Sequence, residues 1–365
     1  MRPLRRKNGN YTHARCQPAA RLACGKHRFN GILSSLGRIL CAGHDEACSS
    51  AGQERKAGLA GAIKAGIVVD DAAQLLELTP SARRRTFPAW HFAMLNDTER
   101  NAALENMVAG LDLAGKMVLE IGTGCGLMAL LFAKYGAEHV HTCEINRDLA
   151  DVASGSIAET PFRNKITLHR KSSTALVRSG SLPRSPDIIF TETLDCGVVG
   201  EGFFAISRDI CRVAGPQTQV VPSVVRQFGM LVEASSLRNL NQVEAACGFD
   251  LSALNVHSTE TYFPIHEEMH DYSPLSQAFR LRDYSYVSSK PPSPVEVPVH
   301  HSGAADGVIS WFEAQFGSEI VSNCPGSRGH WHQAFHPFAT RIPVAAQASL
   351  WLIVDDQGRM AVPAP

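Results

Sequence analysis

The feature that most constrains the fold is an alternation of strand-like and helix-like segments between residues 115 and 222. The apolar, strand-like runs span 117–121, 139–144, 165–170 and 187–192. Two helix-length segments, 127–137 and 147–159, separate the first three runs. Parallel strands need a long connection between them, which is usually a helix. The alternation therefore predicts an α/β domain with a doubly wound parallel sheet.

The segments before and after this region differ from it, and from one another, in composition and in the structure they predict. Residues 1–65 are predicted to be a basic leader and linker without stable structure, and 66–88 a short helical lead-in that includes 71-DAAQLLEL-78. The α/β domain is placed at 89–217. Residues 218–365 are rich in strand-forming runs, Pro, Ser and His, which favours a β-barrel or sandwich.

Composition excludes several classes of protein. Lys+Arg and Asp+Glu both number 35, so the overall charge gives no reason to expect direct nucleic-acid binding. No run approaches the about 20 apolar residues of a membrane span. The ten cysteines form no CxxC pair, which favours reduced thiols in the cytoplasm, or in the nucleus of a eukaryotic cell. The acid-free leader leaves organelle targeting as an alternative.

A glycine-rich turn, 118-VLEIGTGCG-126, follows the first strand and opens a helix. Its glycines, Gly122, Gly124 and Gly126, lack the GxGxxG spacing of dinucleotide sites. Glu120 would repel a diphosphate but would accept an α-ammonium group, and Glu144 ends the next strand, where it can bind ribose hydroxyls. S-adenosylmethionine satisfies both demands. The alternatives are a tight turn with two solvated carboxylates and an NAD site.

Two glutamates, Glu192 and Glu201, flank an apolar, glycine-marked loop after the fourth strand. Close carboxylates repel one another unless a cation lies between them. Guanidinium is a planar cation with donors suited to bidentate pairing. The pattern therefore predicts a site that binds a guanidinium beside the cofactor, and an exposed turn at Glu201 is the alternative.

Together these motifs resemble the protein arginine methyltransferases. The segment 192-ETLDCGVVGE-201 matches the double-glutamate loop of that family, and its LDxGxxGEG form is most similar to the type III, monomethylating branch and its tandem relatives. The resemblance begins near Ala89 and extends to the C-terminus. It implies a Rossmann-like class I methyltransferase domain, a β-barrel domain and a helical dimerisation arm at about 234–275, hence a homodimer.

The resemblance also implies roles for residues around the cofactor. Met94 would face the transferred methyl group, Arg100 would pair with the cofactor carboxylate, and His91 would lie near the cofactor. Ser172 and Ser173 stand where the family often has an acidic adenine contact, and their hydroxyl groups would bond the adenine amino group less strongly.

On the substrate side, the resemblance pairs His330 with Asp97 and makes Trp331 a wall of the arginine channel. Asp97 also has the residue type and position of a helix N-cap. With His332 and His336, His330 forms a histidine cluster that raises the alternative of a metal site. No Cys or carboxylate accompanies the cluster in that motif, so no metal is predicted.

One departure from the family concerns the tyrosine pair that precedes the active-site helix. Ser81 and Arg85 stand in those positions, or else Phe87 and Trp90 with altered spacing. The predicted activity is methyl transfer from S-adenosylmethionine to an arginine nitrogen of a protein or peptide. A methyltransferase for free arginine or another small guanidino compound, and an inactive scaffold, are the two alternatives.

Overall fold

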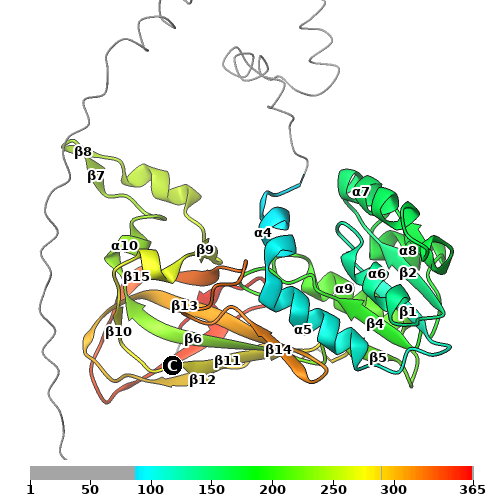
Figure 1. The fold of residues 1–365 in the computed structure, drawn as a ribbon. Coiled ribbons are helices and arrows are strands. Elements are labelled where there is room, and N and C mark those ends of the chain that lie inside the picture. The colour runs from blue at the N-terminus through cyan, green and yellow to red at the C-terminus, as the bar shows by residue number, and fades with distance from the viewer. Residues whose placement is uncertain (1–86, 289, 364–365) are drawn as a thin grey trace, which may run out of the picture. The chain divides into compact units, whose positions relative to one another are not determined.

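The structure, a computed structural model, describes residues 87–288 and 290–363 (Figure 1). All of these residues belong to one compact unit, Arg85–Pro365. The predicted leader, the linker and the helix at 71–78 lie outside the described residues.

The first part of the described chain is a five-stranded parallel sheet in the order β3-β2-β1-β4-β5. Its strands are β1 (Met117–Ile121), β2 (His139–Cys143), β3 (Ile166–His169), β4 (Ile188–Thr191) and β5 (Gln219–Val221). Four of them were predicted. The strand order reverses between β1 and β4, and ligands of open α/β sheets bind outside the carboxyl ends of strands at such a point.

Six helices accompany this sheet (Figure 1). They are α4 (Trp90–Asn96), α5 (Thr98–Ala109), α6 (Leu127–Lys134), α7 (Arg147–Ala158), α8 (Ser173–Ser179) and α9 (Phe203–Val213). A break between α4 and α5 lies at Asp97, the predicted N-cap, whose ψ of 91° is extended. The break occurs because Asp97 is the N-cap of α5. Its side chain caps that helix, and its extended backbone cannot continue α4.

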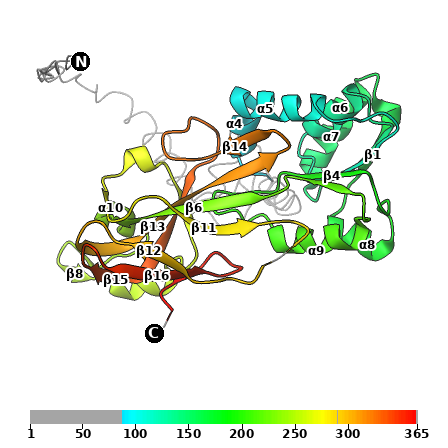
Figure 2. The same ribbon diagram turned by 90° about the horizontal axis from the view of Figure 1, so that it is seen from below.

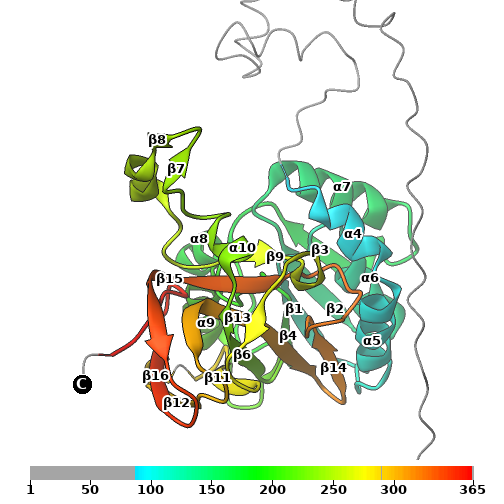
Figure 3. The same cartoon turned by 90° about the vertical axis from the view of Figure 1, so that its left-hand side faces the viewer.

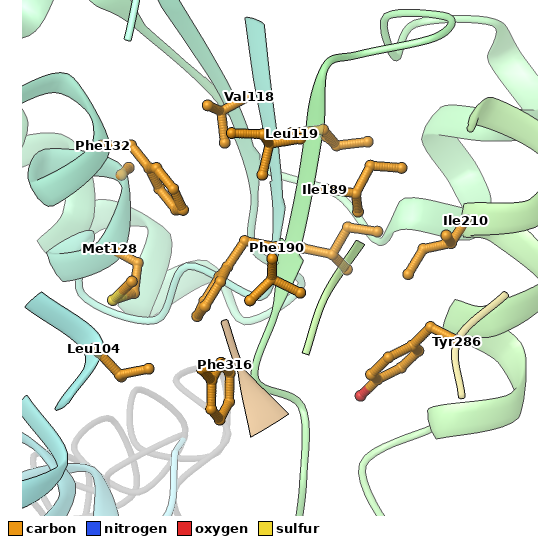
Figure 4. Close-up of a cluster of buried hydrophobic side chains, with 14 of the residues drawn as sticks. Leu104, Val118, Leu119, Met128, Phe132, Ile189, Phe190, Ile210, Tyr286 and Phe316 are labelled. Atoms are coloured by element: carbon orange, nitrogen blue, oxygen red, sulfur yellow. The ribbon is translucent and has the colours of Figure 1, made fainter. Parts of the chain in front are cut away.

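The core of the α/β part continues into the β part. Phe190 of β4 lies between Phe132 of α6, at a ring-centroid distance of 5.6 Å, and Phe316, at 5.9 Å (Figure 4). Phe316 ends strand β13 (Gly303–Phe316) of the β part. Ile210 of α9 lies on the other side of β4 (Figure 4). One apolar cluster therefore fixes the parallel sheet against the C-terminal strands.

The C-terminal part consists mainly of two antiparallel sheets (Figure 2). The seven-stranded sheet runs β10-β6-β13-β15-β9, with β11 on β6 and β14 on β13; the other runs β12-β16-β17. The seven are β6 (Val225–Glu233), β9 (Phe263–Ile265), β10 (Ser273–Pro274), β11 (Phe279–Tyr284), β13 (Gly303–Phe316), β14 (Glu319–Ser322) and β15 (Gln333–Val344). The three are β12 (Val295–Pro298), β16 (Ser349–Val354) and β17 (Met360–Ala361). Leu231, Val308 and Leu352 share a buried cluster that joins the two sheets.

An arm leaves this part after β6 and carries α10 (Ser235–Arg238) and the short hairpin β7 (Ala245–Ala246) and β8 (Phe249–Asp250) (Figure 3). The chain rejoins the main sheet at β9, so the excursion is shorter than the predicted 234–275. Several large apolar side chains on it are exposed, among them Phe249, Leu254 and Val256.

Two further predictions concern boundaries and membranes. Strand β5 pairs with β4 in the parallel sheet, so this sheet extends past the predicted boundary at residue 217. Among the described residues, no helix is long and apolar enough to cross a membrane.

Candidate active site

A cavity of about 480 Å³ lies at the carboxyl ends of β1, β2 and β4. Predicted site residues from separate parts of the sequence line it. They are His91, Met94, Arg100, Glu120, Gly122, Gly124, Glu144, Ser172, Ser173, Glu192 and Glu201. Gly126, Asp97, His330 and Trp331 do not line this cavity.

The glycine-rich turn closes one side of the cavity. Gly122, Gly124 and Gly126 have φ angles of 85°, 56° and 95°, a region that favours glycine. A Cβ at Gly126 would lie 3.5 Å from Ala153 in α7, which is an ordinary contact distance, so the positive φ and not crowding favours glycine there. Ile121 at the end of β1 and the first two glycines of the turn border the cavity.

Glu120, at the end of β1, is almost fully buried. Its Oε2 accepts hydrogen bonds from Thr123 Oγ1 at 2.8 Å and Thr142 Oγ1 at 2.6 Å. Burial raises the pKa of Glu120 to about 7. A cation entering the cavity would favour the ionised form, so Glu120 suits an ammonium group.

Glu144, at the end of β2, is fixed by backbone donors. Its Oε2 accepts from the N–H of Gly124 at 2.9 Å, and its Oε1 accepts from the N–H of Asn146 at 2.8 Å. Asn146 also caps α7. A carboxylate held this way retains further lone pairs that can accept ribose hydroxyl groups.

Glu192 already binds a guanidinium in this structure. Arg100, buried on α5, donates from Nε to Glu192 Oε1 at 2.8 Å and from Nη2 to Glu192 Oε2. A third donor, Nη1, bonds Asn101 Oδ1 at 2.8 Å. The predicted contact of Arg100 with a cofactor carboxylate therefore stays a prediction, and two of its N–H groups remain for it.

Glu201 has different surroundings from Glu192. Among the described residues, its carboxyl group makes no hydrogen bond or ion pair. Burial raises its pKa to about 7, and the negative charges of Asp195, Glu192 and Glu144 add to that effect. The carboxyl group borders the cavity, so it is ready to accept a donor from a ligand.

Aromatic residues form the wall contributed by the start of α4. The Trp90 ring stacks on His91 at 3.9 Å, and Phe87 meets His91 edge-on at 5.5 Å. Burial lowers the pKa of His91, which favours the neutral ring. Met94 lines the same wall one turn later. Phe87 and Trp90, the alternative places for the family's tyrosines, both border the cavity.

The predicted Asp97–His330 pair is present beside the cavity. Asp97 Oδ1 accepts from the backbone N–H of Arg100 at 3.0 Å, while Oδ2 accepts from the backbone N–H of His330 at 2.9 Å and contacts its Nδ1 at 3.0 Å. Trp331 donates from Nε1 to the carbonyl of Leu194 at 2.8 Å. These contacts connect the 330–331 segment to α5 and to the double-glutamate loop.

The two serines predicted to contact adenine line the cavity, but their hydroxyl groups already have partners. Ser172 caps α8 by accepting from Ala175 N at 3.2 Å, and Ser173 donates to Asp209 at 2.8 Å. Their role toward a cofactor stays a prediction.

The histidines of the C-terminal motif do not converge. His336 is fully buried and contacts Ser310 Oγ at 2.8 Å, whereas the ring of His332 lies 3.9 Å from that of His266. No group of three His, Cys, Asp or Glu residues within residues 87–288 and 290–363 is placed to hold a metal ion.

Sequence reasoning did not identify four residues that shape the site. Thr123 and Thr142 hold Glu120; the first lies within the glycine motif, and the second requires the register of β2 on β1. Asp195 and Tyr262 are hydrogen-bonded at 2.8 Å although they are far apart in the sequence. No local pattern signals that contact.

Comparison with known proteins bears on this geometry. No protein-family profile matches the chain. An arginine N(omega)-methyltransferase of Streptomyces achromogenes subsp. streptozoticus is 38% identical over 276 residues, covering 74% of this chain and 76% of that protein. The chain belongs to the arginine N-methyltransferase family.

Longer members of the family match less closely. Protein arginine N-methyltransferase 9 of Mus musculus is 28% identical over 290 residues, which cover 68% of this chain and 34% of that protein. The chain therefore spans about a third of that relative.

Solved structures show the same fold as this arginine N-methyltransferase. The Trypanosoma brucei PRMT1 enzyme–prozyme complex with AdoHcy has a TM-score of 0.62 at 16% identity, covering 73% of this chain and 87% of that one. Protein arginine methyltransferase 10 of Arabidopsis thaliana has a TM-score of 0.57 at 18% identity, with the same coverage.

This arginine N-methyltransferase is thus an enzyme that uses S-adenosylmethionine and methylates an arginine guanidino nitrogen. The donor set fits that cofactor. Glu120 offers a carboxyl group for an ammonium, Glu144 offers acceptors for ribose, and Arg100 retains donors for a carboxylate.

Proposed function

We propose that the enzyme adds a single methyl group to a terminal guanidino nitrogen of arginine in a protein or peptide. The observation that carries this proposal is the contrast between the two glutamates. Glu192 is oriented for bidentate contact with a guanidinium, and Glu201 borders the same cavity without a partner among the described residues. The LDxGxxGEG form of the loop supports monomethylation.

The two carboxyl groups, of Glu192 and Glu201, would have different roles toward the substrate. S-adenosylmethionine, when bound, supplies the methyl group on an electrophilic sulfonium centre and leaves as the neutral thioether. Glu192 holds one side of the guanidinium, so that positive charge gathers there and a terminal nitrogen keeps lone-pair character. Glu201 orients that nitrogen. Its raised pKa suits it to accept the proton released when the N–C bond forms.

The test uses methyl-labelled S-adenosylmethionine with arginine-rich peptides, followed by acid hydrolysis and separation of the amino acids. Label in monomethylarginine alone is the expected result. Label in dimethylarginine would contradict monomethylation but retain the reaction. Label in no arginine derivative, with cofactor binding intact by calorimetry, would contradict the proposed function.

A second candidate substrate is free arginine. The relative at 38% identity is named for arginine, not for protein arginine, and is matched over 76% of its length, whereas the longer protein arginine methyltransferase is matched over 34%. The same labelling with free arginine in place of peptides separates the two. A kcat/KM for free arginine at least about 100-fold above that for peptides, equivalent to about 2.7 kcal/mol, would select this candidate.

The arm supports a further part of the proposal, a homodimer. Leu240, Phe249, Leu254 and Val256 are between 60% and 80% exposed on this short excursion. Large apolar side chains gathered on one protruding segment are typical of a protein interface. A second copy of the chain is the proposed partner that covers these side chains.

We also propose that the enzyme is located in the cytoplasm.

A further inference from the structure

The loop between the two catalytic glutamates is folded around an aromatic side chain from elsewhere. Tyr262 directly precedes β9, at the point where the arm rejoins the main sheet. Its hydroxyl group donates to Asp195 Oδ2 at 2.8 Å. Asp195 Oδ1 in turn accepts from the N–H of Gly200 at 3.0 Å. Asp195 therefore joins Tyr262 to the residue just before Glu201.

The ring of Tyr262 fits edgewise between two glycines. A Cβ at Gly197 would lie 2.3 Å from Tyr262 Cε2, and a Cβ at Gly358 would lie 2.3 Å from Tyr262 Cε1. Real Cβ atoms do not approach this closely, so any larger residue at either position would displace the ring. The ring in this position therefore requires glycine at both Gly197 and Gly358.

The loop also has a conformation that needs outside support. Val198 is fully buried and has a φ of 79°, in the left-handed region. This region is unfavourable for a β-branched residue, and such conformations persist only where surrounding contacts determine them. The bonds from Asp195 to Gly200 and from Tyr262 to Asp195 are contacts of this kind.

We infer that Tyr262 is a positioning residue that acts through Asp195 to hold Glu201 at the substrate. This inference rests on the proposed function, because it assigns Tyr262 to the placement of the carboxyl group that binds the guanidinium. Tyr262 itself does not line the cavity. Because it follows the arm directly, it also links the substrate loop to the root of the arm.

Tyr262→Phe is the sharpest test, because it keeps the ring between the two glycines and removes only the hydroxyl group. A small displacement of a substrate-holding group is expected to lower kcat by about 10- to 100-fold. Binding of S-adenosylhomocysteine, measured by calorimetry, is expected to change less than about 2-fold, since the hydrogen bond between Tyr262 and Asp195 does not involve the glycine-rich turn. Tyr272→Phe, at a tyrosine of the β part that does not line the cavity, is the matched control and should leave kcat within about 2-fold.

Two further measurements separate positioning from a general loss of structure. In an Asp195→Ala background, Tyr262→Phe should cause no further loss of kcat, because both residues act through one hydrogen bond. Hydrogen exchange at the amides of Val198 and Gly200 should rise about 10-fold or more in Tyr262→Phe, while amides of β1 and β4 stay protected.

Unchanged kcat and exchange in Tyr262→Phe would overturn the inference, and so would an equal loss of kcat in the Asp195→Ala background. If the unmodified enzyme transfers no methyl group to arginine, the proposed function fails instead. In that case the hydrogen exchange of Val198 and Gly200 in Tyr262→Phe is the remaining test of whether Tyr262 fixes the loop.

Discussion

At the scale of single residues, Glu192 and Glu201 border one cavity but have different partners. Glu192 is held by the buried guanidinium of Arg100, whereas Glu201 makes no hydrogen bond among the described residues. A half-buried carboxyl group without a partner stabilises the fold little and is available to bind a cation. The two positions should therefore respond differently to the same substitution.

Glu201→Gln removes this charge and keeps the shape of the side chain. We expect kcat for arginine to fall by about 100- to 1,000-fold, as for the loss of one preorganised group that acts on the reacting atoms. The midpoint of thermal unfolding should stay the same or rise, because no native contact is lost. A fall in both the midpoint and the affinity for S-adenosylhomocysteine would contradict this assignment.

Glu192→Gln is the matched comparison. It weakens a buried ion pair and leaves the Arg100 guanidinium without full compensation, which should destabilise the enzyme by about 3–5 kcal/mol. Chemical denaturation with both variants measures the difference directly. Equal stability of the two variants would show that the Arg100 contact contributes little to folding.

The raised pKa of Glu201 gives a pH dependence with a definite sign. Its carboxyl group, which faces Asp195, Glu192 and Glu144, has a pKa of about 7 in the fold, above the ordinary glutamate value of 4.5. Below pH 6 it is protonated and holds a guanidinium poorly, so kcat/KM should rise through about pH 7. Stability has the opposite trend: the contribution of this group is present below pH 4.5 and is lost as the pH rises through 7.

The measurement compares the enzyme with Glu201→Gln at pH 5 and pH 8. The gain in thermal midpoint from the substitution should be larger at pH 8. A larger gain at pH 5 would mean that the ionised carboxyl group is stabilised by the fold.

Much of the site was predictable at this scale because local patterns carry it. The strand–turn–helix motif placed Glu120 and the glycines, and the ends of successive strands placed Glu144 and Glu192 at one edge of the sheet. Tyr262 could not be predicted, since its contact with Asp195 depends on the path of the arm. The partner of Arg100 could not be predicted either, because Glu192 lies 92 residues later in the chain and only the fold brings the two together.

At the scale of elements, Asp97 connects three parts of the site. It ends α4, caps α5 and accepts two donors from His330. Burial acts to raise the pKa of Asp97, but the hydrogen bonds from Arg100 and His330 outweigh it, so that the pKa is lowered. The Asp97 carboxylate is therefore ionised at the pH at which the enzyme is active.

Asp97→Ala should cost about 1–2 kcal/mol for the lost helix cap, in addition to the unsatisfied N–H groups of His330. Asp97→Asn is the control for the cap, since its amide oxygen can still accept from Arg100 N. If both variants lose the same stability, the His330 contacts and not the cap stabilise this junction. Denaturant titrations that yield the free energy of unfolding provide the comparison.

Most elements of the α/β part followed from the sequence. The hydrophobic runs and the segments between them predicted β1 to β4, α6 and α7 to within a few residues. The N-cap predicted at Asp97 is present, and the same aspartate also follows the end of the short helix α4. The antiparallel strands were predicted only as a class, since their pairing joins segments far apart in the chain.

At the scale of the whole molecule, the arm determines the proposed assembly. Phe249→Ser combined with Leu254→Ser removes two exposed apolar side chains without touching the core. We expect the double variant to sediment as a monomer at concentrations where the unmodified enzyme is a dimer. Loss of two anchoring apolar contacts should weaken association by at least about 10-fold. A monomeric unmodified enzyme would contradict the dimer.

The pairing of Arg100 with Glu192 has a consequence for the resting enzyme. Between turnovers the pocket carries its own counterion, so one of its buried carboxylates is neutralised before any substrate arrives. An incoming arginine joins an existing arrangement of charges and does not have to expel a shell of bound water from that carboxylate. After transfer, the methylated product leaves behind a site already balanced by its neighbour, which lowers the tendency of the product to remain.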